Sequence, residues 1–177
     1  SDTWISERTG FYTYCVRGDM NNNTMSFDLG LSKIDYSDLR SLRFRSNRSI
    51  SKEEFLERLF FSLPKSVRSR MKIKLEPDAQ KFGNSEIIKG DDHFCFKVAS
   101  VTDYEIVLAG KIKHLSIRIA VALINSIDNE YIGVVSSKIR FDNIGGKIYF
   151  LFMKPFYRRI ITLICLRTEN HFNTAQN

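Results

Sequence analysis

His114 and Arg118 are the two residues whose types and spacing best suit chemistry in this chain. Polar and apolar residues alternate from His114 onward, which predicts a β-strand, and residues four apart on a strand share one face. A histidine can act as a general acid or base near neutral pH, and a guanidinium can stabilise an oxyanion. One interpretation is therefore a polar site, used by a cyclase-like or hydrolase-like enzyme or to bind an anionic head group.

The same alternation also has a purely structural explanation. Leu115, Ile117 and Ile119 form the apolar face of the predicted strand, and we expect that face to be the one packed against the protein core. We therefore expect His114 and Arg118 to lie on the outer face or at the rim of the sheet, without a chemical role. We assign no catalytic residue, and whether the protein is an enzyme stays open, with the sequence favouring a non-enzymatic role.

Metal and thiol chemistry find little support in the sequence. Asp91, Asp92 and His93 have the right ligand types, but neighbouring residues on a strand point to opposite faces, so a turn leading into a strand explains them better. Three widely spaced cysteines without a C-x-x-C pair suggest neither a disulfide framework nor a zinc site. We expect Cys95 and Cys165 to be buried, and we expect no metal and no cofactor.

Composition predicts one globular domain, and the widely spaced cysteines suggest a reducing cytoplasm. The 177 residues are 43% hydrophobic and 27% charged, which excludes a wholly disordered chain. The net charge of +7 favours anionic partners, but the lysines and arginines are spread along the chain. Lys65, Arg68 and Lys72 share one helical face without interleaved aromatic residues, so we do not expect nucleic-acid binding.

The patterns predict a strand, two helices and then an antiparallel meander. Residues 1–33 lack periodicity and are interpreted as an extension, in which residues 11–18 either add a short strand or pack as a strap. After a strand at 38–45, Ser51 and Glu54 form a capping box, and Pro64 separates the helix they begin from a second helix at 65–75. The predicted strands are 86–89, 93–101, 104–109, 114–126 and 130–142, joined by connections too short for crossover helices.

The most apolar stretch of the chain predicts a long amphipathic helix at 146–167. Lys147, Lys154, Arg158 and Thr162 draw one polar stripe along it, and the charged residues interrupt the run of about 20 apolar residues that a membrane span needs. We therefore expect a soluble protein without a membrane span. Gly145 and Gly146 are interpreted as the turn before the helix, residues 34–168 as the domain and 169–177 as a tail.

This order of elements predicts an α+β fold in which an antiparallel sheet is covered by the C-terminal helix. It resembles the helix-grip architecture of START-like and Bet v 1-like domains, in which the sheet wraps around the last helix. That resemblance implies a ligand cavity between helix and sheet, whereas a solid core would fill the same space with the same residues.

Three segments carry a more specific resemblance: "KHLSIR" (113–118), "IRFDNIGGKIYF" (139–150) and "KPFYRRII" (154–161). Together with "SKEEFLERLFFSLPKSVRSRM", they are similar to a bacterial family, domain of unknown function family 2867, from about Asp35 to Arg167. His114, Leu115 and Arg118 match its first motif, whereas Ser116 and Ile117 depart from it. No activity is established for the family, whose members occur alone or fused to short-chain dehydrogenases, so the resemblance implies no catalytic residue.

The predicted function is to bind a hydrophobic or amphipathic, lipid-like small molecule between the sheet and the last helix. Aromatic-rich apolar walls with few polar groups are typical of such sites. The alternatives are the enzyme using His114 and Arg118, or a regulatory partner of a short-chain dehydrogenase. The sequence does not fix the oligomeric state. The predicted lining comprises Phe94, Phe96, Ile117, Ile119, Val135 and Ile139 on the sheet, and Phe150, Met153, Phe156, Tyr157 and Ile160 on the helix.

Overall fold

The computed structural model describes residues 4–8, 11–15, 24–25, 31, 33–70, 87–126 and 129–174. The chain separates into two compact units, residues 1–33 and 34–177. In the first unit, β1 (Trp4–Arg8), β2 (Phe11–Cys15) and β3 (Thr24–Met25) form an antiparallel sheet in the order β1-β2-β3. β2 is the strand alternative for residues 11–18.

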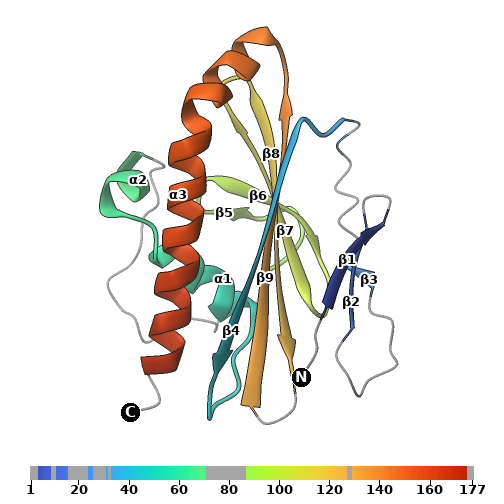
Figure 1. Cartoon of the computed structure of the whole chain (residues 1–177), viewed down its shortest axis with the longest axis vertical. Coiled ribbons are helices and arrows are strands. Elements are labelled where there is room, and N and C mark those ends of the chain that lie inside the picture. The colour runs from blue at the N-terminus through green and yellow to red at the C-terminus, as the bar shows by residue number, and fades with distance from the viewer. Residues whose placement is uncertain are drawn as a thin grey trace. The chain divides into compact units, whose positions relative to one another are not determined.

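The second unit is built on a six-stranded antiparallel sheet in the order β4-β9-β8-β7-β6-β5, with one long helix across it (Figure 1). The last five strands follow one another as the expected meander, and β4 pairs with β9 at the edge. The fold class is therefore α+β, as predicted, and it is consistent with a helix-grip description. The strands are β4 (Tyr36–Arg45), β5 (Asp92–His93), β6 (Phe96–Val101), β7 (Glu105–Ile112), β8 (Leu115–Asn125) and β9 (Glu130–Phe141).

The start of the meander differs from the prediction. Residues 87–90 form no strand, and residue 86 lies outside the described residues. The strand expected over 93–101 is divided by a two-residue turn at Phe94 and Cys95, because His93 pairs directly with Phe96. Phe94 has a φ of 57°, in the left-handed region that such a turn requires. Cys95 is exposed at this turn, so the prediction that it is buried was wrong.

The capping box predicts the start of α1 (Lys52–Phe61) correctly. The Glu54 amide donates to the Ser51 hydroxyl at 3.1 Å, and Arg48 holds the Glu54 carboxylate with both terminal nitrogens. Phe55 and Leu56 of this helix are fully buried. After Pro64, α2 (Lys65–Arg70) follows, and the predicted continuation to residue 75 lies outside the described residues.

The long helix α3 (Ile144–Thr174) starts two residues earlier and ends seven residues later than predicted. Asn143 caps it, because the Gly146 amide donates to the Asn143 side-chain oxygen at 2.9 Å. Gly146 lies inside the first turn, where an added Cβ would be 2.4 Å from the His114 carbonyl oxygen. The glycine therefore permits close helix–sheet approach and does not form the predicted turn.

The C-terminal part of α3 is held by aromatic packing. The Phe172 ring is buried and its centroid lies 4.5 Å from that of Phe44 on β4. The helix thus runs through most of the segment that we assigned to a tail.

Among the described residues, no helix is long and apolar enough to cross a membrane.

Two clusters of buried side chains lie between α3 and the sheet. The larger cluster includes Phe44, Phe55 and Phe172, together with α1. The smaller one, near the start of α3, joins Phe150 to Leu115, Ile117 and Ile139. β8 and β9 also bury residues on their opposite face, where Ala120, Ala122 and Ser136 are inaccessible. The sheet is therefore not divided simply into a core face and an exposed face.

Candidate functional site

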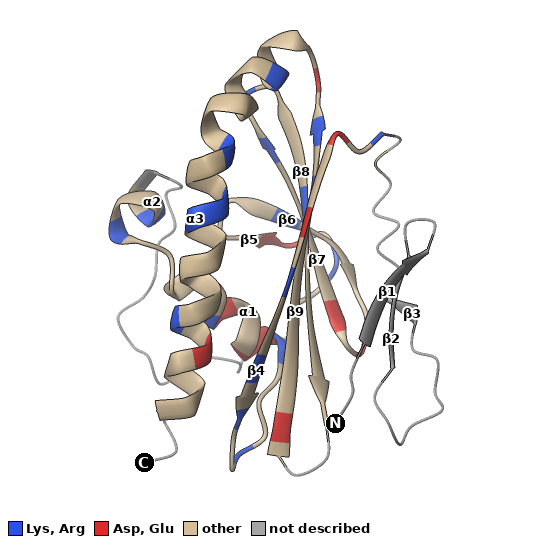
Figure 2. Cartoon of the chain, in the orientation of Figure 1, with Lys and Arg blue, Asp and Glu red and all other residues tan. Residues whose placement is uncertain are grey.

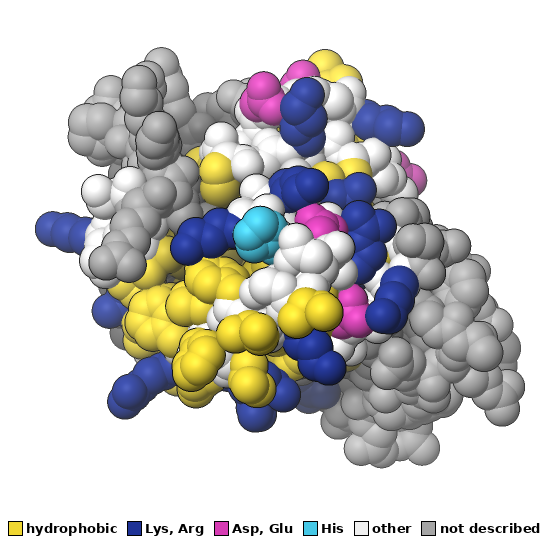
Figure 3. Space-filling model, turned by 90° about the horizontal axis from the view of Figure 1, so that it is seen from above, with side chains coloured by type: hydrophobic (Ala, Val, Ile, Leu, Met, Phe, Trp, Pro, Cys, Tyr) yellow, Lys and Arg dark blue, Asp and Glu magenta, His cyan; other side chains and the backbone are white. Residues whose placement is uncertain are grey.

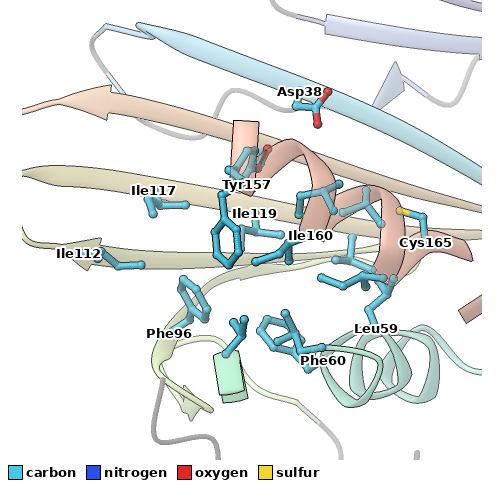
Figure 4. A pocket seen from close by; sticks show the side chains of 18 of the residues that line it. Asp38, Leu59, Phe60, Phe96, Ile112, Ile117, Ile119, Tyr157, Ile160 and Cys165 are labelled. Atoms are coloured by element: carbon cyan, nitrogen blue, oxygen red, sulfur yellow. Dashed lines mark hydrogen bonds between the residues drawn. The ribbon is translucent and has the colours of Figure 1, made fainter. Parts of the chain in front are cut away.

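A pocket of about 250 Å³ lies where the two clusters meet, beneath the middle of α3 (Figure 4). Its floor is the core face of the sheet, and α1 and α2 close one side. The pocket lies where three sets of apolar side chains converge. These are the alternate residues on the core face of the sheet, the apolar face of α1 and the inner face of α3. The lining residues are Asp38, Leu59, Phe60, Leu63, Val67, Phe96, Ile112, Ile117, Ile119, Val121, Val135, Ser137, Met153, Phe156, Tyr157, Ile160, Ile161, Ile164 and Cys165.

The few polar groups of the pocket lie together on β4, β9 and α3. Asp38 is the direct register partner of Ser137, and the Tyr157 and Ser137 hydroxyls are hydrogen-bonded. The Arg40 Nε lies 3.3 Å from an Asp38 carboxylate oxygen, which offsets the negative charge. Burial strongly raises the pKa of Tyr157, so its hydroxyl stays protonated and can donate at any physiological pH.

The mouth of the pocket lies between α3 and the end of β7. Among the lining residues, Phe156 of α3 is 52% exposed and Ile112 of β7 is 37% exposed, whereas Phe96 and Ile117 nearby are buried. Figure 4 shows Ile112 and Phe96 at one side of the pocket and Cys165 at the opposite side. Burial raises the pKa of the Cys165 thiol to about 11. The thiol is therefore uncharged at neutral pH, and it lines the pocket without acting as a nucleophile.

The structure brings eight of the eleven predicted lining residues around this pocket. These eight are Phe96, Ile117, Ile119, Val135, Met153, Phe156, Tyr157 and Ile160. Phe94 lies elsewhere because it belongs to the β5–β6 turn, where its ring stacks on Phe60 at 4.5 Å. Ile139 and Phe150 pack in the smaller cluster instead, so they support the start of α3 without lining the pocket.

His114 and Arg118 are not brought together at the pocket. His114 is exposed in the β7–β8 turn, and its Nδ1 lies 3.2 Å from the Asn143 side-chain nitrogen. Arg118 is partly buried on the other face of the sheet, between Ala109 and Lys138 in register. Neither residue lines the pocket. The described residues contain no cluster of potential metal ligands, so His93 belongs to none there.

Sequence reasoning missed the wall contributed by the first two helices. Leu59, Phe60 and Leu63 follow the helical period of α1, and Val67 continues the wall on α2. The periodicity identified this apolar face of α1 but did not show that it faces α3 and the sheet across the pocket. Asp38 and Ser137 were also missed, because their proximity depends on the pairing of β4 with β9, which are distant in sequence.

An antiparallel sheet covered by a long C-terminal helix, with a mostly apolar pocket between them, defines an α+β domain that is consistent with the helix-grip architecture. A family model described as Protein of unknown function (DUF2867) matches residues 31–163, and the chain belongs to this family. The match covers α1, α2 and most of α3, the three helices that line the pocket. No curated protein matches the chain.

Proposed function

We propose that the protein binds a hydrophobic or amphipathic small molecule in the pocket beneath α3 and performs no chemistry on it. The observation that carries this proposal is the pocket itself, whose nineteen lining residues include only Asp38, Ser137 and Tyr157 as oxygen-bearing side chains. Apolar walls with a few convergent polar groups are typical of small-molecule sites.

The size of the pocket limits the ligand. Its volume of about 250 Å³ lies below the roughly 300–1,000 Å³ of most small-molecule sites. It exceeds the apolar cavity of about 150 Å³ that holds a benzene ring. A fused ring system or a segment of an acyl chain therefore suits it, with any longer part leaving through the mouth at Phe156.

The polar groups favour an uncharged head group. The Tyr157 and Ser137 hydroxyls carry two donor hydrogens and use one of them in their mutual bond, so at most one remains for a ligand. Asp38 lies beside them, and although Arg40 partly offsets its charge, its carboxylate disfavours a carboxylate or phosphate. A hydroxyl, ester or ketone oxygen is therefore the ligand group we expect at this end.

The enzyme alternative receives no support from the geometry, since neither His114 nor Arg118 lines the pocket.

We place the binding role in the cytoplasm because Cys95 and Cys165 are free thiols, as suits a reducing compartment.

Native mass spectrometry of the purified full chain tests the proposal. We expect a mass adduct of a small apolar molecule on the wild type and on Leu166→Trp, which enlarges an exposed residue on the outside of α3. Ile119→Trp, which fills the pocket, should lose the adduct while keeping a cooperative thermal transition. Absence of any adduct, with no uptake of added N-phenyl-1-naphthylamine, would contradict a binding role.

A further inference from the structure

The first half of α3 exposes a stripe of large apolar side chains. Leu151 is 69% exposed and Phe152 is 76% exposed, and Ile144, Ile148 and Phe156 are also more than half exposed. A contiguous apolar surface of this kind usually marks a contact site. We call these five residues and Ile112 the apolar end surface.

Helix geometry makes the five α3 residues continuous. Their spacings of four, three, one and four residues place them along one side of the helix, whereas Phe150 on the other side is buried against the sheet. The stripe ends at Phe156, at the mouth of the pocket, and Ile112 of β7 lies there too. Figure 3 shows hydrophobic side chains gathered at the end of the molecule where α3 begins.

Positive charge surrounds the apolar end surface. From Ile144 to Thr168, α3 contains no Asp or Glu but carries Lys147, Lys154 and three arginines (Figure 2). In the β7–β8 region, Lys111 and Lys113 add two more charges, and the Lys113 ammonium lies 4.6 Å from the Tyr149 ring centroid. Figure 3 shows Lys and Arg side chains around the hydrophobic group.

Of the carboxylates near the helix start, Asp35 accepts a hydrogen bond from the Phe141 amide at 2.8 Å, and Asp142 is paired with two cations. Asp142 is 3.3 Å from the Lys111 ammonium and 3.3 Å from an Arg140 nitrogen, and it accepts a hydrogen bond from Ser116 at 2.8 Å. The Ser116 hydrogen bond and the two cations lower the pKa of Asp142, so one negative charge is shared by two positive groups.

We propose that the apolar end surface docks onto an anionic lipid bilayer. Phe152, Leu151 and their neighbours would enter the boundary between head groups and acyl chains, and Lys111, Lys113, Lys147 and Lys154 would meet anionic head groups. Exposed aromatic and aliphatic residues flanked by lysines are the pattern of helices that lie in a membrane interface. Binding at the interface needs no membrane-spanning helix.

Charge favours a lipid surface over a second copy of the chain. A two-fold contact through the apolar end surface would bring Lys147 and Lys154 close to their counterparts, with no acidic residue on the first 25 residues of α3 to pair with them. An anionic bilayer supplies the missing negative charge. Docking would also set the pocket mouth against the lipid, although the docking surface does not depend on the pocket being occupied.

Vesicle flotation with the full chain tests this inference. We expect the protein to float with phosphatidylcholine vesicles that contain about 30% phosphatidylglycerol and to stay unbound with phosphatidylcholine alone. Binding should fall as salt rises from about 0.1 M to about 1 M, where the Debye length shortens from roughly 10 to 3 Å. The pocket-filled variant Ile119→Trp should float like the wild type, which separates this test from that of the ligand.

Matched variants locate the surface. Phe152→Ala should weaken vesicle binding by at least about five-fold, whereas Leu166→Ala, an exposed residue further along α3, should leave it unchanged. Lys147→Glu changes the charge by two units and should weaken binding roughly thirty-fold, whereas Arg43→Glu, exposed on β4 near the opposite end of the sheet, should have little effect.

Two results would overturn the inference. One is equal and negligible flotation with both vesicle types. The other is a dimer in light scattering that Phe152→Ala converts to a monomer, without vesicle binding by either form, because the apolar end surface would then be a contact between copies of this chain.

Discussion

The Tyr157 hydroxyl of α3 and the Ser137 hydroxyl of β9 are hydrogen-bonded across the pocket. Ser137 is 4% exposed, and both hydroxyls lie in a mostly apolar pocket that also contains the Asp38 carboxylate. The bond therefore fixes the height of α3 above the sheet at the point where a ligand head group would lie, and it satisfies two groups that are costly to bury alone.

Tyr157→Phe should lower the free energy of unfolding by about 1–3 kcal/mol, because the buried Ser137 hydroxyl loses its partner. Urea unfolding at neutral pH measures the loss. The double variant Tyr157→Phe/Ser137→Ala should lose less free energy of unfolding than the sum of the losses of the two single variants. Strict additivity would show that the two hydroxyls do not stabilise each other.

Two phenylalanines of α3 should respond differently to truncation. Phe150→Ala should cost about 3–5 kcal/mol, since the ring is buried in the smaller cluster. Phe156→Ala should cost less than about 1 kcal/mol, because its ring is half exposed at the pocket mouth. Thermal or urea unfolding compares the two. Equal losses would mean that Phe156 is enclosed in a solid core.

The start of α3 offers a matched pair of glycines. Gly146→Ala should destabilise the fold although alanine favours helices by about 1 kcal/mol over glycine, since the new methyl group would lie 2.4 Å from the His114 carbonyl oxygen. Gly145→Ala should cost less than Gly146→Ala, because its closest contact, 3.1 Å to the Asn143 side-chain oxygen, is with a side chain that can shift, and the His114 ring lies at an ordinary 3.7 Å. A stable Gly146→Ala variant would refute close helix–sheet contact.

Glu105 should make stability depend on pH. Burial raises its pKa from 4.5 to about 7, an effect that Lys138 partly opposes. The protonated form is favoured in the folded state, so this contribution is complete below about pH 4.5 and is lost as pH rises through about 7. From about pH 5 to about pH 8, the wild type should lose up to about 3 kcal/mol relative to Glu105→Gln in urea unfolding. Parallel pH curves for the two proteins would contradict this.

Local patterns predicted the elements of the fold well where the signal was also local. Ser51 and Glu54 marked the start of α1 because capping involves residues three apart. The alternation along β8 placed Ile117 and Ile119 on the pocket side. The start of α3 was misplaced because the role of Gly146 depends on its close approach to the His114 carbonyl, a contact between residues far apart in the sequence.

The same limit applied to the site. The period of α1 identified an apolar face with Leu59 and Phe60, but only tertiary packing shows that this face and α3 enclose one space. Phe94 fitted a strand pattern and was assigned to the lining, yet its positive φ places it in a turn. Arg118 and Lys138 could not be placed next to each other before the register of β8 and β9 was known.

The most direct measurement of the central claim is a fluorescence titration with N-phenyl-1-naphthylamine, whose emission rises in an apolar site. The probe should bind the wild type saturably, and Phe152→Ser should bind it equally well, because Phe152 lies outside the pocket. Ile119→Trp should abolish binding while the protein still unfolds cooperatively. Equal binding by Ile119→Trp and the wild type, together with loss of binding in Phe152→Ser, would show that the probe occupies the exposed face of α3 and that the pocket holds no ligand.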